Sequence, residues 1–158
     1  MPVAHETPGY TAQAAGLLTP SARPNASAYG GTLHSMRHTY TTTTGTDEVA
    51  TDTIQIGYLP KGATVLPGLS YIVQEDPTSS ADATLDVGTA TDPNGFAEAI
   101  AISTAGVKPF ITTTTLPAQV LVPVTTTEET LVYATFGGTP ATMTASKKIT
   151  FVIVYEMN

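Results

Sequence analysis

The chain contains no cysteine and no tryptophan, and charged residues make up only 12% of its 158 residues. The lack of cysteine excludes disulfide bonds, thiolate metal sites and cysteine nucleophiles. The charged fraction is about half of that in a typical soluble domain. Stability must therefore come from packing or from partners, and not from covalent crosslinks.

Positive charge is scarce as well, because six Lys and Arg stand against 13 Asp and Glu, for a formal net charge of −7. Binding of nucleic acid requires clustered Lys and Arg, so we predict no nucleic-acid partner. No apolar run approaches membrane-spanning length, and the N-terminus lacks the basic and continuous apolar regions of a signal peptide. We therefore expect a protein made in the cytoplasm, with no membrane partner.

Threonine takes the place of the missing charge, at roughly a fifth of the chain. A β-branched residue with a hydroxyl group suits the solvated face of a strand better than a helix. The composition therefore favours an all-β fold. The length is sufficient for one hydrophobic core and indicates a single folded domain.

Residues 1–31 differ from the rest, because they mix Pro, Gly, Ala, Ser and Thr without a helical or an alternating period. This segment is predicted to be an extended N-terminal arm, and the alternative is a disordered tail. An arm with spaced apolar residues can become ordered on a neighbouring subunit. The candidate partner-binding residues are Tyr10, Leu17, Leu18 and Tyr29.

Residues 32–158 show short runs of β-forming residues separated by Gly and Pro, which is typical of a β-sandwich or barrel. The expected strands are 33–44, 52–58, 63–73, 82–88, 96–102, 118–125, 129–136 and 147–156. The expected turns are Gly45 and residues 59–62, 75–80, 92–95, 106–109 and 137–140. We predict an antiparallel β-sandwich, jelly-roll-like, of about eight strands. The segment 96–102 could also be one short helix.

Alternation assigns some of the strand faces. In 52–58 the predicted buried face consists of Ile54, Ile56 and Tyr58. In 82–88 it consists of Ala83, Leu85 and Val87. The last strand is apolar on both faces, so we expect it to be central in its sheet or covered by another subunit.

The segment LDVGTATDPNGFAEAI at 85–100 gathers aspartates, an asparagine and glycines, as a cation or phosphate loop does. An EF-hand loop needs oxygen ligands at alternating positions with Gly sixth, and the order Asp92, Pro93, Asn94, Gly95 does not fit it. A phosphate loop needs Lys after its last Gly, which is missing here. The same four residues match a type I turn, so we predict a corner between strands.

No other cluster predicts chemistry. His34 and His38 lie about 13 Å apart if their segment is a strand, so one chain cannot bring both to one metal ion. The adjacent carboxylates Glu75 and Asp76, like Glu128 and Glu129, point to opposite faces of an extended chain. We therefore predict no catalytic residue, no cofactor and no metal site.

Two stretches resemble a known family. The motif I-x-I-G-Y-L-P-K-G-A-T-V-L at 54–66 and the motif T-L-D-V-G-T-A-T-D-P-N-G-F at 84–96 are similar to head-decoration, or capsid cement, proteins of tailed bacteriophages and related virion proteins. The resemblance implies a β-sandwich, often a homotrimer, that binds the major capsid protein on the exterior of the assembled capsid. It implies a structural role in the virion without enzymatic activity. The alternatives are a tail-fibre receptor- or carbohydrate-binding module and a tail-structural subunit.

Overall fold

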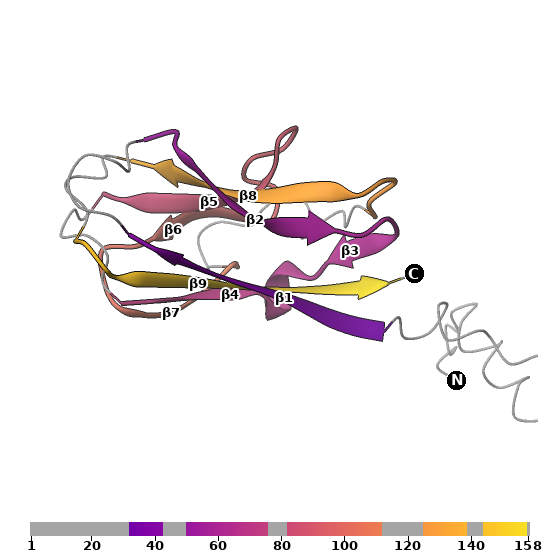
Figure 1. Cartoon of the computed structure of the whole chain (residues 1–158), viewed down its shortest axis with the longest axis horizontal. Coiled ribbons are helices and arrows are strands. Elements are labelled where there is room, and N and C mark those ends of the chain that lie inside the picture. Colours follow the sequence, from indigo (N-terminus) through magenta and orange to yellow (C-terminus); the bar gives the residue numbers. More distant parts are fainter. Residues whose placement is uncertain (1–31, 43–49, 76–81, 112–124, 139–143, 158) are drawn as a thin grey trace, which may run out of the picture.

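The computed structural model describes residues 32–42, 50–75, 82–111, 125–138 and 144–157. Within these ranges the chain forms nine strands and one short 3-10 helix, and no helix long and apolar enough to cross a membrane (Figure 1). The elements are β1 (Thr32–Thr41), β2 (Thr53–Leu59), β3 (Ala63–Val65), η2 (Pro67–Leu69), β4 (Tyr71–Gln74), β5 (Thr84–Thr89), β6 (Ala97–Ala101), β7 (Gly106–Pro109), β8 (Thr130–Gly137) and β9 (Lys148–Met157).

The strands form two antiparallel sheets that pack face to face (Figure 1). One sheet has the order β1-β9-β4-β7, with β3 also paired to β9, and the other has the order β2-β8-β5-β6. Because β3 and β4 pair with successive parts of one side of β9, they share a single strand position. Of the eight positions, the first then pairs with the eighth, the second with the seventh, the third with the sixth and the fourth with the fifth. This is the winding of a jelly roll, and the predicted fold class is confirmed.

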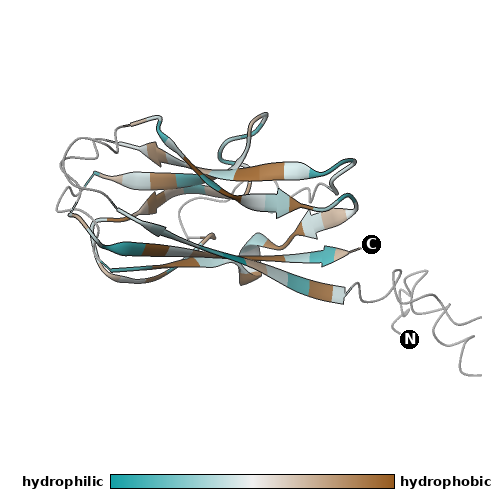
Figure 2. Ribbon diagram, in the orientation of Figure 1, coloured by the Kyte–Doolittle hydropathy of each residue, from teal (hydrophilic) through white to brown (hydrophobic). Residues whose placement is uncertain are grey.

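The hydrophobic core lies between the two sheets, because each strand directs every second side chain inward. Apolar and polar residues alternate along the strands in Figure 2. The largest fully buried side chains are Phe110, Phe151, Leu59, Ile72, Leu85, Ile100, Ile102, Ile149, Ile153, Val87 and Val132. Burial of one such side chain stabilises a fold by about 1.5–3 kcal/mol. The predicted buried face of 82–88 is confirmed, since Ala83, Leu85 and Val87 all belong to this core.

The predicted face of the strand at 52–58 is partly wrong. Ile54 and Ile56 are buried, but Tyr58 is 59% exposed and Leu59 is buried in its place. The reason is a β-bulge in β2, where the register against β8 shifts between Gln55 and Gly57. One extra residue in a strand exchanges the two faces for everything that follows it.

The predicted strand at 63–73 is divided by η2, which begins at Pro67. Pro has no N–H to give to a ladder, so the strand stops there and resumes at Tyr71. The buried Ser70 joins the break to the sheet, because its Oγ donates to the Leu66 carbonyl at 2.9 Å and accepts from the Val154 amide at 3.0 Å.

Two further segments are strands in the structure. Residues 97–101 form strand β6, which settles the choice between strand and helix. The prediction of a turn at 106–109 is wrong, because these residues form strand β7, paired with β4. Gly and Pro are tolerated there because β7 is short and lies at the edge of the sheet.

Strand β9 is central, as predicted, with β1 on one side and β3 and β4 on the other. Its outer side chains Val152 and Val154 remain half-buried, so the described residues do not cover that face. Several predictions lie outside the described residues. They are the arm 1–31, residues 43–44 and 118–124 of two predicted strands, the turn at Gly45, residues 76–80 of the turn predicted at 75–80, and residues 139–140 of the turn predicted at 137–140. The domain boundary at residue 32 stays a prediction.

Candidate functional site

The corner at Asp92–Gly95 is a hydrogen-bonded turn. The Gly95 amide donates to the Asp92 carbonyl at 3.2 Å, which closes a four-residue turn. The Thr89 amide donates to the same oxygen at 2.9 Å, so the Asp92 carbonyl accepts two hydrogen bonds within the loop. The Phe96 amide then rejoins the sheet at the Val87 carbonyl, at 2.9 Å. The interpretation of this segment as a corner is confirmed.

Gly88 explains the spacing of this motif. A Cβ atom at Gly88 would lie 2.0 Å from the Asp92 carbonyl oxygen and 2.6 Å from the Pro93 carbonyl carbon. The loop therefore folds back directly onto the backbone of β5, and only glycine leaves room for it. In the motif D-V-G-T-A-T-D-P-N-G, two backbone segments therefore lie in close contact, and Gly88 is needed for this packing.

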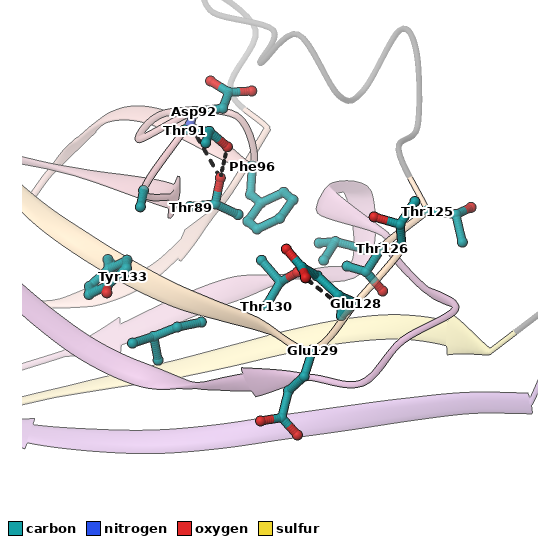
Figure 3. Close-up of a pocket in the computed structure, with 14 residues that line it drawn as sticks. Thr89, Thr91, Asp92, Phe96, Thr125, Thr126, Glu128, Glu129, Thr130 and Tyr133 are labelled. Atoms are coloured by element: carbon teal, nitrogen blue, oxygen red, sulfur yellow. Dashed lines mark hydrogen bonds between the residues drawn. The ribbon is translucent and has the colours of Figure 1, made fainter.

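A hollow of about 560 Å³ opens between this corner and the segment that leads into β8 (Figure 3). Its lining is rich in threonine and consists of Val65, Thr89, Ala90, Thr91, Asp92, Phe96, Thr125, Thr126, Thr127, Glu128, Glu129, Thr130, Leu131 and Tyr133. The ring of Phe96 lies between the two walls, and the Glu129 side chain points away from the corner (Figure 3).

The threonines of the hollow are mostly engaged with their own surroundings. Thr126 Oγ1 donates to the Pro60 carbonyl at 2.6 Å and accepts from the Ala63 amide at 2.9 Å. Thr125 Oγ1 lies 2.7 Å from Thr64 Oγ1, at a β-bridge between these two residues. Such hydroxyl groups hold the chain connection to β3, and they carry no sign of an activated nucleophile.

The described lining of the hollow contains no histidine. His34 and His38 do not line it, so no described imidazole can act as a base for its hydroxyl groups. The described residues contain no group of three or more His, Asp or Glu side chains that could hold a metal ion.

The two histidines of β1 are held apart by the sheet. His34 stacks on Tyr155 of β9, with ring centroids 5.4 Å apart. His38 lies opposite Phe151, four residues further along the paired strands. Of the strand that we predicted at 33–44, residues 33–41 are confirmed, and the two imidazoles have separate surroundings.

The outer face of the five-stranded sheet is a second candidate surface. Val107 of β7 and Val73 of β4 are paired there and are 63% and 39% exposed. Val152, paired with Tyr71, extends the same face, and Leu33 at the far end is 59% exposed. Exposed apolar side chains that lie together, unlike single scattered ones, make a face a candidate for contact with other protein. The sequence indicated only part of this face, because residues 106–109 were expected to be a turn.

The predicted partner-binding residues Tyr10, Leu17, Leu18 and Tyr29 lie outside the described residues. The structure therefore leaves their role as a prediction.

No family model matches the chain, and no curated protein matches it. Solved structures match its fold. A chain of the cyanophage Pam1 capsid asymmetric unit is 20% identical, with a TM-score of 0.61 over 82% of this chain and 88% of that one. A chain of the Ralstonia phage GP4 capsid is 21% identical, with a TM-score of 0.61 over 81% of this chain and 86% of that one. At these identities the likeness establishes the fold.

Proposed function

We propose that this chain is a structural protein of a tailed-phage virion that binds the exterior of the assembled capsid as a cement protein. The observation that carries the proposal is the jelly roll itself, which matches chains of two phage capsids over about four fifths of this chain. The motifs at 54–66 and 84–96 support the same role. Their residues form a bulged strand and a corner, both of which serve the fold.

The surface suits close contact with other protein. Charged residues are few, so little charge must be desolvated when a face is covered. The outer face of the five-stranded sheet presents Val73 and Val107 to solvent. A protein that binds the assembled shell but not the free capsid protein stabilises the shell by its binding free energy at every site. Many modest contacts then stabilise the whole particle, and no catalytic group is needed.

The proposed partners are the major capsid protein and further copies of this chain. A homotrimer follows from the resemblance to decoration proteins, which often form trimers. Light scattering on the purified chain tests this directly, because a trimer has three times the chain mass of 16.3 kDa. A monomer at every concentration would contradict the trimer.

Co-sedimentation with capsids of the same phage, emptied and stripped of this chain, tests the cement role. We expect the chain to pellet with assembled shells, to stay in solution with unassembled capsid protein, and to raise the temperature at which the shells come apart. Shells that neither bind the chain nor gain stability would refute the role. Gold-labelled antibody on intact virions separates head from tail, since label on the tail would favour a tail-structural subunit or a tail-fibre module.

A further inference from the structure

Among the described residues, the strand orders of the two sheets end in β1 and β7 and in β2 and β6. The free side of β3, which pairs with β9 beside β4, is bridged by Thr125. An edge strand exposes unpaired backbone groups, which makes it a template for adding another strand. Natural proteins block edges that must stay free with bulges, short strands, Pro, Lys or inward-pointing charges. The four edges can therefore be compared for such blocks.

Both edges of the four-stranded sheet are bulged. Strand β2 has its register shift between Gln55 and Gly57. Strand β6 has another, because Leu85 and Val87 of β5 pair with Ile100 and Ala97, which leaves one extra residue in β6. Ala99 lies in this bulge with a φ of 52°, a conformation that interrupts a regular ladder.

Strand β7 is blocked in other ways. It has only four residues and ends at Pro109, which has no N–H to donate. Lys108 pairs with Ile72, whose side chain is buried in the core, so Lys108 belongs to the inward face. Its Nζ donates to Thr104 Oγ1 at 2.9 Å. An inward-pointing charge on an edge strand hinders addition of a further strand.

Strand β1 has no bulge and no inward-pointing Lys, Arg, Asp or Glu, and its one charged residue, Arg37, lies on the outer face because it pairs with Val152. All ten of its residues pair with β9 in one unbroken register, from Thr32 opposite Met157 to Thr41 opposite Lys148. It contains no Gly, Pro or Lys. Among the described residues nothing pairs with the outer edge of 32–39. This is a long, regular edge open to another strand.

We propose that this edge accepts residues 9–19 of the N-terminal arm of a second copy as an added strand. The arm directly precedes Thr32 in the sequence, so it is joined to the domain at the first residue of β1. Residues 9–19 are its longest stretch without Pro, and their length matches the ten residues of β1. Residues 20–31 between them and β1 can extend to roughly 40 Å, enough to reach a neighbouring molecule.

A tight hairpin within the same chain fits this edge less well. A hairpin through Gly30 and Gly31 would lay residues 20–29 against β1, and these include Pro20 and Pro24. Each Pro removes a backbone donor from the ladder. A donated strand avoids both of them and joins copies head to tail, an arrangement that can close into a ring.

Mixed disulfides test the proposal, because the chain has no cysteine of its own. Ser35→Cys in β1 is mixed, as the full-length chain, with single variants that carry Cys at one of the positions 11 to 17, which covers both a parallel and an antiparallel added strand. We expect a crosslinked dimer at alternate arm positions only, since a disulfide needs Cα atoms within about 7 Å and neighbouring residues face opposite sides. Gln55→Cys on the bulged β2 is the matched control and should give no dimer.

Each other result overturns the proposal. Crosslinking of Ser35→Cys with itself would mean that two β1 strands pair. Crosslinking only within one chain that carries both cysteines would mean that the arm folds back on its own domain. No crosslink in any combination would mean that the edge takes no arm.

A second measurement uses proline inside the arm. Ala14→Pro removes a donor from the added strand, whereas Ala22→Pro changes the linker, which already holds Pro20 and Pro24. We expect Ala14→Pro to weaken self-association by roughly tenfold or more and Ala22→Pro to leave it unchanged. Equal association of the two variants would contradict the proposal. Both experiments use the purified chain without capsids, so their failure would leave the cement role untouched.

Discussion

Asp86 holds the backbone of Ala99 across the β5–β6 pair, because its Oδ1 accepts a hydrogen bond of 2.7 Å from the Ala99 amide. Ala99 is the bulged residue with a φ of 52°. A residue other than glycine in that region costs of order 1–3 kcal/mol and persists only where its surroundings hold it. The aspartate in the sequence motif L-D-V-G therefore fixes an edge of the sheet.

Removal of this acceptor should destabilise the domain. We expect Asp86→Ala to lower the free energy of unfolding by about 1–2 kcal/mol, because the Ala99 amide loses its partner while its strained conformation remains. Asp86→Asn keeps an oxygen at the same position and should lose less than half as much. Urea unfolding of the three proteins measures this, and equal midpoints for Ala and Asn would show that the hydrogen bond contributes little.

Gly88 offers a sharper test of the corner. A Cβ atom there meets the Asp92 carbonyl oxygen at 2.0 Å, and backbone cannot move aside cheaply. We expect Gly88→Ala to cost about 3 kcal/mol or more in unfolding free energy, in the range of severe overpacking. Gly68→Ala is the matched control, since its Cβ atom would meet only Ile111 Cδ1 at 3.6 Å. A fully stable Gly88→Ala protein would contradict this account of the motif.

The fold class was predictable because most strands carry their signal locally. The β5 strand is an example, since Leu85 and Val87 alternate with polar residues and both face the core. The same reasoning failed at Tyr58, because a bulge in β2 exchanged the faces and nothing in the adjacent residues marks it strongly. It also failed at 106–109, where the Gly and Pro that indicate a turn are accepted by an edge strand.

The candidate surfaces were less predictable than the fold. The corner at Asp92–Gly95 was identified because turn chemistry depends on four consecutive residues. The outer face of the five-stranded sheet is assembled from β4, β7 and β9, which are distant in sequence. The open edge of β1 depends on which strands fail to pair with it, and such information exists only in the assembled sheet.

Gln74 is buried, and we predict that its replacement by Glu makes the stability of the domain depend on pH. Its Nε2 donates to the carbonyls of Ala101 and Thr104, at 3.2 and 2.5 Å. In Gln74→Glu an ionised carboxylate would face these two oxygens in a buried site, which raises the pKa of the introduced carboxyl above the value of about 4.3 for an unfolded chain. The buried site accepts the protonated carboxyl but not the ionised one. The variant is therefore most stable below about pH 4.3, and it loses stability as the pH rises through the pKa that this carboxyl has in the folded protein.

We expect the free energy of unfolding of Gln74→Glu to be lower than that of the native chain by about 2 kcal/mol or more at pH 7. At pH 4 the difference should be clearly smaller. Urea unfolding at three pH values measures the difference. Gln55→Glu on the exposed face of β2 is the control and should show no such trend. A constant gap for Gln74→Glu across the range would mean that the carboxyl reaches solvent.

Ile72 and Val73 are neighbours in β4 that face opposite sides of the sheet, the first fully buried and the second 39% exposed. We expect Ile72→Ala to lower the free energy of unfolding by about 2–5 kcal/mol, through lost burial and a cavity. Val73→Ala should cost about 1 kcal/mol or less, because little surface changes its environment. Thermal and urea unfolding of both variants provide the measurement. A large loss for Val73→Ala would mean that the outer face is already covered in the purified protein, by a second copy or by the chain's own arm. A small loss would leave its apolar side chains free for a partner that is met only on assembly.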